Sequence, residues 1–239
     1  MKIEIWSDVV CPFCYIGKRK LEEALNTFSH KDDVNIEFKA YELDPNAAPY
    51  TGQDFYESMA AKFGSVEQAK QMTANIVQQA KSVGLDFHFD TMKPTNTFDA
   101  HRITKYAKEH GKDAAISEKL LYANFTESKE VGNHETLAEI AEDAGLNKDE
   151  ALKVLQDKEA YRDEVNNDIS EAKQFGIQGV PYFIINRKYA ISGAQPTETF
   201  TQALEQVWEE ENKITPIQDL STDDDSACGP DGCAVPDQN

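Results

Sequence analysis

Two cysteines separated by two residues stand near the start of the chain, in the segment Cys11-Pro12-Phe13-Cys14. Thiols at this spacing can interconvert between a dithiol and a disulfide, because one attacks a foreign disulfide and the other closes the ring. The same spacing also suits half of a zinc site or an inert buried pair. The first chemistry that the sequence suggests is therefore thiol-disulfide exchange, and the surrounding elements must decide between these alternatives.

The cysteine segment lies between a predicted strand and a predicted helix. Residues 3–6 begin with the apolar and polar alternation of a strand, and residues 18–28 carry apolar side chains at helical spacing. At a helix start the amide groups lack partners and the helix dipole is positive, which favours a thiolate at Cys11. Pro12 suits the first helical position. We therefore predict Cys11 as the attacking nucleophile and Cys14, one turn further in and more shielded, as the resolving thiol.

Composition bounds the class of protein. The chain has 239 residues, of which 40% are hydrophobic, enough for a sizeable core. The formal charge of −19, from 43 acidic and 24 basic residues, repels nucleic-acid phosphates and anionic lipid surfaces. No export signal opens the sequence, no apolar run approaches a membrane span, and four cysteines are few for a secreted disulfide scaffold. We expect a cytoplasmic protein without nucleic-acid or membrane partners.

Strand patterns occur only towards the two ends of the chain. Residues 34–41 alternate like a second strand, while residues 180–185 and 189–191 predict two more, followed by an amphipathic helix at 197–212. Between about residues 53 and 175 the pattern is helical. A βαβ start and a ββα end separated by a helical block predict an α/β protein: a thioredoxin fold with a large inserted all-helical domain.

The predicted elements divide the chain into three parts. We place a discontinuous thioredoxin-fold domain at residues 1–50 and 170–217, the inserted helical domain at 51–169, and a flexible acidic C-terminal tail at 218–239. The two pieces of the thioredoxin-fold domain must meet to complete one sheet. Segments far apart in the sequence are therefore expected side by side.

A second cysteine pair, Cys228 and Cys233, lies in the predicted tail. One hypothesis is a redox relay, in which a tail thiol exchanges with Cys11 over a mobile linker. A disulfide confined to the tail, or adventitious metal binding, is the alternative. A zinc site of four thiolates fits the number of ligands, but Cys11 and Cys14 lie where a nucleophile is favoured, so we expect no metal.

The segment Gly179-Val180-Pro181 precedes the third predicted strand. In a thioredoxin fold this loop faces the helix start that carries the cysteines, and we expect the X–Pro bond to be cis there. A cis bond would expose the backbone of Val180 for pairing with an extended substrate, and Pro181 would crowd out a metal ion. An ordinary proline at the start of an edge strand is the alternative. We predict catalytic roles for Cys11, Cys14 and Pro181, and substrate contacts for Pro12, Phe13 and Val180.

Further motifs accompany the cysteines and the proline loop. They are Trp6-Ser7-Asp8, Asn96-Thr97 with Ala100-His101-Arg102, Gly176-Ile177 and Phe183, and Ser192-Gly193-Ala194-Gln195. With these pieces, which span nearly the whole chain, the sequence resembles the DsbA-like thioredoxin-fold oxidoreductases, and within them the FrnE-like branch. The resemblance implies a dithiol-disulfide oxidoreductase with a cis Pro181. Some members of the branch also have a second cysteine pair in the tail, like Cys228 and Cys233.

The kappa-class glutathione transferases and the 2-hydroxychromene-2-carboxylate isomerases resemble the chain in the Asn-Thr and Ala-His region. Those relatives place a serine where this chain has Cys11, and a serine holds a glutathione thiol without forming a disulfide. We therefore expect exchange with disulfide-containing proteins or small thiols. A glutathione-dependent transferase or isomerase, and a non-enzymatic redox-sensing or metal-binding module, stay open as alternatives. We expect no tightly bound cofactor and leave glutathione as a redox partner, and a homodimer, open.

Three features receive mainly structural interpretations. His101 is interpreted as a satisfied helix histidine rather than a general base. Asp8, three residues before Cys11, either tunes the thiol chemistry or only ends the strand. A set of apolar residues at helical spacing is interpreted as core rather than as a peptide groove. Its members are Phe55, Tyr56, Met59, Phe63, Met72 and Ile76.

Overall fold

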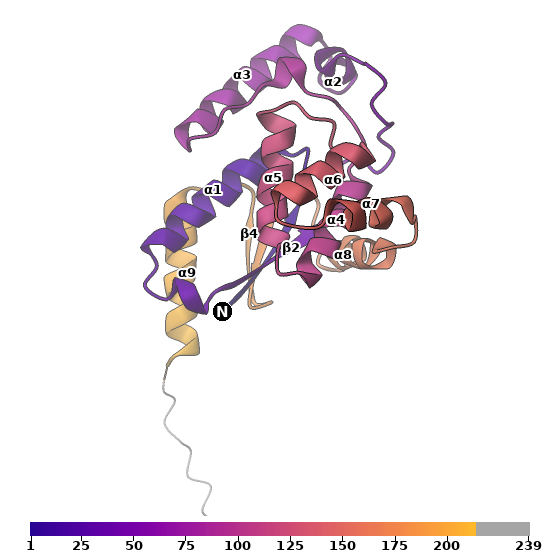
Figure 1. Ribbon diagram of the computed structural model, residues 1–239. Coiled ribbons are helices and arrows are strands. Elements are labelled where there is room, and N and C mark those ends of the chain that lie inside the picture. Colours follow the sequence, from indigo (N-terminus) through magenta and orange to yellow (C-terminus); the bar gives the residue numbers. More distant parts are fainter. Residues whose placement is uncertain (214–239) are drawn as a thin grey trace, which may run out of the picture.

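The computed structural model describes residues 1–213 of the chain, and Figure 1 shows their arrangement. Within this part the chain forms a four-stranded sheet surrounded by helices. The strands are β1 (Lys2–Ser7), β2 (Asn35–Ala40), β3 (Tyr182–Ile185) and β4 (Tyr189–Ser192). The helices are α1 (Pro12–Thr27), α2 (Phe55–Phe63), α3 (Val66–Ser82), α4 (Phe98–Glu109), α5 (Asp113–Phe125), α6 (His134–Asp143), α7 (Lys148–Gln156), α8 (Arg162–Gln174) and α9 (Thr197–Glu211), with short 3-10 turns at Lys31–Asp33 and Phe89–Thr91.

The sheet joins the two ends of the described chain. Its strand order is β2-β1-β3-β4, with β1 parallel to β2 and antiparallel to β3. Parallel neighbours need a crossover, which α1 supplies. The β3-β4 hairpin turns at Asn186 and Arg187, whose φ angles of 51° and 54° match the right-handed twist of the strands. The predicted α/β class, a thioredoxin fold with a helical insertion, is confirmed.

Different helices cover the two faces of the sheet. Ile5 and Phe183 point to one face, where they pack with residues of α1 and α9, two helices that contact each other and cross in Figure 1. Trp6 and Ile184 point to the other face and pack with Ala172 of α8. Neighbouring residues of one strand thus enter different hydrophobic clusters, as the two-residue period of a strand requires.

Helices α2 to α8 follow one another between β2 and β3. Two of these helices begin at a side-chain N-cap: Ser65 accepts a hydrogen bond from the backbone N–H of Gln68, and Asn133 accepts one from that of Thr136. Residues of α4 to α7 form a hydrophobic cluster together with Val9 and Val131. The domain boundaries proposed from the sequence stay predictions. The predicted tail at 218–239, with Cys228 and Cys233, lies outside the described residues.

Buried charges fix α4 and α8 against the sheet. The Asp168 carboxylate on α8 accepts hydrogen bonds from the Lys39 ammonium at 3.1 Å and from the Ala40 backbone N–H at 2.8 Å, and it pairs with Lys105 of α4. The indole N–H of Trp6 donates to the Asp168 backbone oxygen at 3.0 Å. Because buried charges are costly unless paired, this network holds α4 and α8 in one position against β2.

Candidate active site

The chain turns from β1 into α1 through the cysteine segment. The Cys11 backbone N–H donates to the Asp8 carbonyl oxygen at 3.1 Å, and the Cys14 N–H donates to the Cys11 carbonyl at 3.1 Å. Cys11 is the N-cap of α1, with an extended φ of −90° and ψ of 112°, and Pro12 is the first helical residue. The side chain of Cys11 therefore lies at the positive end of a 16-residue helix, where a thiolate is stabilised.

Both cysteines are free thiols and both are buried. Cys11 is 4% exposed and Cys14 is 3% exposed, so the greater shielding expected for Cys14 is not seen in whole-residue exposure. The surroundings still separate them chemically. Burial and then the neighbouring Cys11 thiol raise the pKa of Cys14 well above its ordinary value, and hydrogen bonds from the Ser7 hydroxyl and the Asp8 backbone N–H do not offset this rise. Cys14 is thus held as a thiol.

The proline loop lies against the cysteine segment. The Val180–Pro181 peptide bond is cis, as predicted. The Cys11 thiol donates to the Val180 carbonyl oxygen at 3.4 Å, which places that backbone directly beside the sulfur. Pro181 is buried next to Gly17 of α1, while Val180 is partly exposed. The structure therefore brings Cys11, Val180 and Pro181 together.

The two residues between the cysteines face outwards. Pro12 is half-buried, and Phe13 is 36% exposed, one of the more exposed large hydrophobic side chains in the described part of the chain. An exposed aromatic ring beside a reactive thiol is available to a substrate. Their predicted role in substrate contact stays a prediction.

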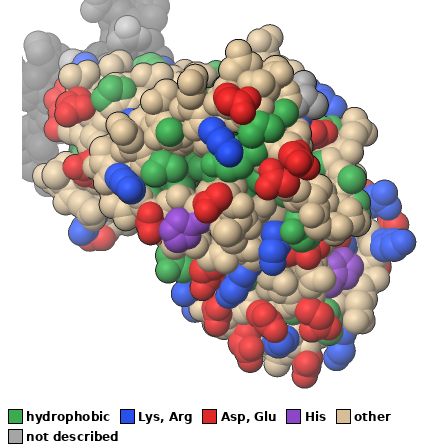
Figure 2. Space-filling model, turned by 90° about the horizontal axis from the view of Figure 1, so that it is seen from above, with side chains coloured by type: hydrophobic (Ala, Val, Ile, Leu, Met, Phe, Trp, Pro, Cys, Tyr) green, Lys and Arg blue, Asp and Glu red, His purple; other side chains and the backbone are tan. Residues whose placement is uncertain are grey.

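A groove of about 470 Å³ opens beside the cysteine segment. Val10 and Pro12 line one part, and the loop after β2, helices α2 and α3, and the segment 89–95 before α4 line the rest. Figure 2 views the molecule from the end at which α2 and α3 lie and shows hydrophobic side chains gathered near the middle of this face, with charged groups around them. The groove lining is mainly apolar and includes Leu43, Phe55, Met59, Phe63, Met72 and Ile76.

This groove corrects the interpretation of the apolar residues on α2 and α3 as core. Phe55 and Ile76 are buried, at 8% and 7% exposure, but Phe63 and Met72 are each 38% exposed. The two buried residues and the two exposed ones line the same groove. The stripe is therefore core at its base and accessible surface at its rim.

The structure also corrects the interpretation of His101 as a satisfied histidine. His101 is 5% exposed and Asp8 is 1% exposed, and the ring Nε2 lies 3.5 Å from Asp8 Oδ1. Neither atom has a hydrogen-bond partner within the described residues. The other carboxylate oxygen of Asp8 accepts from the Leu43 N–H at 2.8 Å. A buried acid and a buried histidine thus face each other directly behind the cysteine segment.

The motif residues around His101 converge on this place. Asn96 donates its side-chain N–H to Glu42 at 3.4 Å. Burial raises the pKa of Glu42; the charge of His101 opposes this rise and that of Asp8 adds to it, so all three groups are close enough to interact. Sequence reasoning placed Asn96 and His101 in a family-like motif. Glu42 was missed, because only the fold brings the loop after β2 to α4.

Arg102, the next residue of the motif, has a structural role. It is 2% exposed, and its guanidinium donates to the backbone oxygens of Ala160 and Val154 at 2.7 Å each, to that of Leu155 at 3.4 Å and to that of Asp157. These carbonyls lie at and after the C-terminal end of α7, where a cation complements the helix dipole. Arg102 therefore fixes α7 on α4.

Two general findings apply to residues 1–213. Within that range no three His, Cys, Asp or Glu side chains are placed to hold a metal ion together. No helix in the same range has the length and apolar character needed to cross a membrane.

A thiol pair at the start of the first helix and a cis-proline loop beside it, in a thioredoxin fold with a helical insertion, define a DsbA-like thiol oxidoreductase fold. The chain belongs to that family: the sequence model of the DSBA-like thioredoxin domain matches residues 2–205. The predicted resemblance to the DsbA-like proteins is confirmed.

Individual relatives agree with this assignment. The crystal structure of a probable DsbA oxidoreductase from Streptomyces coelicolor matches with a TM-score of 0.84 and 44% identity, covering 99% of this chain and 100% of that one. YwbO, an uncharacterized protein of Bacillus subtilis, is 27% identical over 204 residues, which are 84% of this chain and 94% of its own length.

More distant structures share the fold. A 2-hydroxychromene-2-carboxylate isomerase matches with a TM-score of 0.64 and 13% identity, covering 88% of this chain and 98% of the isomerase. The cytosolic disulfide reductase DsbM of Pseudomonas aeruginosa matches with a TM-score of 0.62 and 14% identity, covering 88% of this chain and all of that one, and DsbM is also known in complex with GSH. The expected structural kinship with the isomerases is confirmed.

Proposed function

We propose that this protein is an enzyme that exchanges dithiols and disulfides in protein substrates, with Cys11 as nucleophile and Cys14 as resolving thiol. The observation that carries the proposal is the position of Cys11: it caps α1 and lies 3.4 Å from the backbone oxygen of Val180, next to the cis proline. A thiolate is favoured at a helix start, and a free backbone edge beside it offers hydrogen bonds to an extended substrate.

The reaction has two steps. In the first, the Cys11 thiolate attacks a substrate disulfide, forms a mixed disulfide and releases one substrate sulfur as a thiolate. In the second, Cys14 loses its proton and attacks the Cys11 sulfur; the bond to the substrate breaks, and the second substrate sulfur leaves. The substrate is reduced and the enzyme ends with a Cys11–Cys14 disulfide. The reverse sequence of steps oxidises a substrate dithiol.

The groove supports a polypeptide as the substrate. Its apolar lining starts at Val10 and Pro12, next to Cys11, and reaches Met72 on α3. A segment of unfolded protein that carries apolar side chains near its cysteine would bury them there while the sulfur meets Cys11. Phe13, 36% exposed, extends this apolar surface across the cysteine segment.

Insulin reduction tests the proposal. Cys11→Ser should abolish the activity of the full chain, because the thiol left in α1, that of Cys14, is buried and held protonated. Cys14→Ser should instead trap a mixed disulfide between Cys11 and the substrate, visible as a mass increase on non-reducing mass spectrometry. Full activity of the Cys11→Ser variant would contradict the proposal.

A glutathione-dependent transferase or isomerase is a second candidate, favoured by the likeness to 2-hydroxychromene-2-carboxylate isomerase and to DsbM, which is known with GSH. The two candidate functions differ in whether glutathione binding requires the Cys11 thiol. Saturable binding of glutathione in isothermal titration calorimetry should survive Cys11→Ser if a non-covalent glutathione site exists, whereas a thiol-exchange partner should lose its heat signal with that variant.

A further inference from the structure

Asn124 of α5 contacts the turn that leads into the cysteine segment. Its side chain is 0% exposed, and its Nδ2 donates a hydrogen bond to the carbonyl oxygen of Val9 at 3.2 Å. Its Oδ1 has no hydrogen-bond partner among residues 1–213. Burying an amide with one of its polar atoms unpartnered costs free energy, whereas a leucine of similar shape would bear no such cost. Such a group in a native structure needs a physical reason.

We propose that Asn124 is a positioning residue for the nucleophile Cys11. By holding the carbonyl of Val9, Asn124 fixes the turn between β1 and α1, and with it the place of the Cys11 sulfur. This inference rests on the proposed thiol-disulfide exchange, because it concerns the attack of Cys11 on the substrate disulfide. Asn124 acts through the backbone of the turn, two residues before the nucleophile.

The turn comprises residues 8–11, and the hydrogen bond from the Cys11 N–H to the Asp8 carbonyl at 3.1 Å closes it. Because this bond joins the two ends of the turn, it leaves the orientation of the central peptide group open: that group can rotate while the turn stays closed. The oxygen of the central peptide group belongs to Val9 and is the atom that accepts from Asn124. The side-chain hydrogen bond therefore sets the orientation that the bond within the turn does not.

The two valines in the middle of the turn have different surroundings. Val9 is 6% exposed and belongs to the hydrophobic cluster that includes α4 to α7, whereas Val10 lines the apolar groove beside Cys11. The peptide group that joins the two valines thus links the helical insertion to the groove and, one residue later, to the nucleophile. A rotation of this group would shift the Cys11 sulfur relative to the Val180 carbonyl oxygen, which lies 3.4 Å away.

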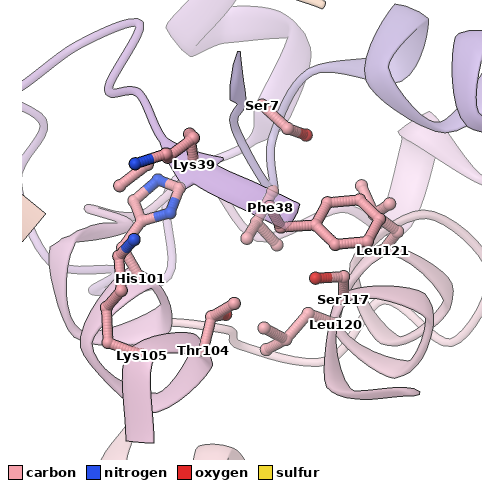
Figure 3. Close-up of a pocket in the computed structure, with 11 residues that line it drawn as sticks. Ser7, Phe38, Lys39, His101, Thr104, Lys105, Ser117, Leu120 and Leu121 are labelled. Atoms are coloured by element: carbon pink, nitrogen blue, oxygen red, sulfur yellow. The ribbon is translucent and has the colours of Figure 1, made fainter. Parts of the chain in front are cut away.

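Packing alone does not hold Val9 on every side. A small cavity of about 20 Å³ borders this residue, and Figure 3 shows the cavity between α4, which carries Thr104, and α5, which carries Ser117 and Leu120. Asn124 lies one turn beyond Leu120 on the same face of α5. Since a side chain beside a void has fewer van der Waals contacts on that side, packing leaves Val9 room to shift. The hydrogen bond from Asn124 limits that movement.

The position of the turn affects both the rate and the equilibrium of exchange. In the attack, the Cys11 thiolate bonds to one sulfur of the substrate disulfide, the bond between the two substrate sulfurs breaks, and the other sulfur leaves as a thiolate. This displacement requires alignment, so a turn that occupies several positions attacks more slowly. In the oxidised enzyme the bond to Cys14 itself holds Cys11. Loss of the Asn124 contact should therefore weaken the reduced form more than the oxidised form and favour the disulfide.

Two substitutions remove the donor with different effects on stability. Asn124→Leu keeps a similar shape and removes the unpartnered oxygen together with the donor, so the midpoint of urea unfolding should change little. Asn124→Ala removes the same donor but leaves a cavity, so the midpoint should fall. An effect on Cys11 that the two variants share must then come from the lost hydrogen bond to Val9 and not from lost stability.

The variants are compared in the full chain with Cys228→Ser and Cys233→Ser, where the two α1 thiols are the only ones left. A chromogenic aryl disulfide, dithiobis(nitrobenzoate), releases a coloured thiolate when Cys11 attacks, at a rate that depends on reagent concentration. Both Asn124 variants should slow this phase about 3- to 10-fold. Both should also shift the equilibrium with reduced and oxidised glutathione towards the enzyme disulfide by about 3- to 10-fold, as the loss of one hydrogen bond predicts. Mass spectrometry after alkylation measures that equilibrium.

Asn147→Ala is the matched control, because the Asn147 side chain accepts from the Glu150 N–H and caps α7, away from the turn. It should lower the urea midpoint and change neither the rate nor the equilibrium. A rate or an equilibrium within about twofold of the parent in either Asn124 variant would overturn the proposal while leaving the exchange function intact. Effects that follow the urea midpoint across the three variants would overturn it too. If Cys11→Ser in the same background reacted as fast as the parent, the exchange function itself would fail, and the role of Asn124 with it.

Discussion

The thiol of Cys11 and the carbonyl oxygen of Val180 lie 3.4 Å apart although 169 positions separate the two residues in the sequence. The contact exists because β3 pairs with β1 and carries the proline loop to the start of α1. Gly17, one turn into α1, permits the approach: a Cβ there would lie 3.1 Å from Pro181 Cγ and 3.2 Å from Phe183 Cζ. The helix and the loop can therefore meet only where the helix has no side chain.

Gly17→Val should push the proline loop away from Cys11. The added methyl groups would overlap buried atoms of Pro181 and Phe183, so we expect the free energy of unfolding to fall by about 1–3 kcal/mol and disulfide exchange to slow several-fold. Urea unfolding and insulin reduction measure the two effects. Gly179→Val is the control, because no atom lies within 4 Å of a Cβ there. Equal activity of the two variants would contradict the role of Gly17.

An acidic side chain in the apolar groove should weaken protein substrates selectively. Met72→Asp places a carboxylate on the rim beside Phe63 and Ile76, where an apolar substrate segment would have to desolvate it. We expect kcat/KM for a reduced or scrambled protein substrate to fall about 3- to 10-fold, with the rate towards a small aryl disulfide unchanged. Tyr122→Asp, at a residue 44% exposed on α5 and outside the groove lining, is the control. An equal loss with both kinds of substrate would argue against a peptide groove.

The sequence predicted the features that local patterns determine. The periodicity of apolar residues located β1, α1 and the β3-β4 hairpin, because this periodicity is a local property of the sequence. The cis Pro181 followed from its place in the fold.

The remaining features depend on contacts between distant segments. Periodicity shows that Ile76 and Met72 share an apolar stripe on α3, but not that the stripe stays open at Met72. Whether His101 finds a partner depends on where Asp8 lies, 93 positions earlier, and on the loop that carries Glu42. No spacing rule relates such residues, so a satisfied histidine was the natural expectation and proved wrong.

Arg102 should be among the most sensitive positions for stability. Arg102→Leu removes the donors to the carbonyls at the end of α7 and leaves these wholly or partly buried oxygens without this partner, so we expect a loss of about 3 kcal/mol in the free energy of unfolding. Urea titration followed by circular dichroism measures it. Arg162→Leu removes an exposed guanidinium paired with Glu159 and should cost less than about 1 kcal/mol. A similar small loss at Arg102 would show that its contacts are not needed for stability.

Glu118 on α5 should make stability depend on acid pH through its contacts with α1. Its carboxylate accepts from the Lys18 ammonium at 2.6 Å and the Tyr15 hydroxyl at 2.6 Å, and it pairs with Arg19. Burial alone would raise the pKa of Glu118, but hydrogen bonds from Arg19 and Lys18 hold it at about 2. The folded state thus prefers the ionised form. The resulting stability is complete above the ordinary value of 4.5 and is lost as the pH falls towards 2.

Glu118→Gln tests this contribution, because it removes this one carboxylate and keeps the shape of its side chain. At pH 7 the variant should be less stable than the parent by about 1–2 kcal/mol, a value reduced for solvent screening because the side chain is 29% exposed. The difference should shrink steadily between pH 4.5 and pH 2, as the parent carboxylate takes up its proton. Urea unfolding of both chains at pH 7, 4 and 2.5 measures it. A penalty that stays constant over this range would mean that Glu118 joins α5 to α1 through hydrogen bonds that do not require its charge.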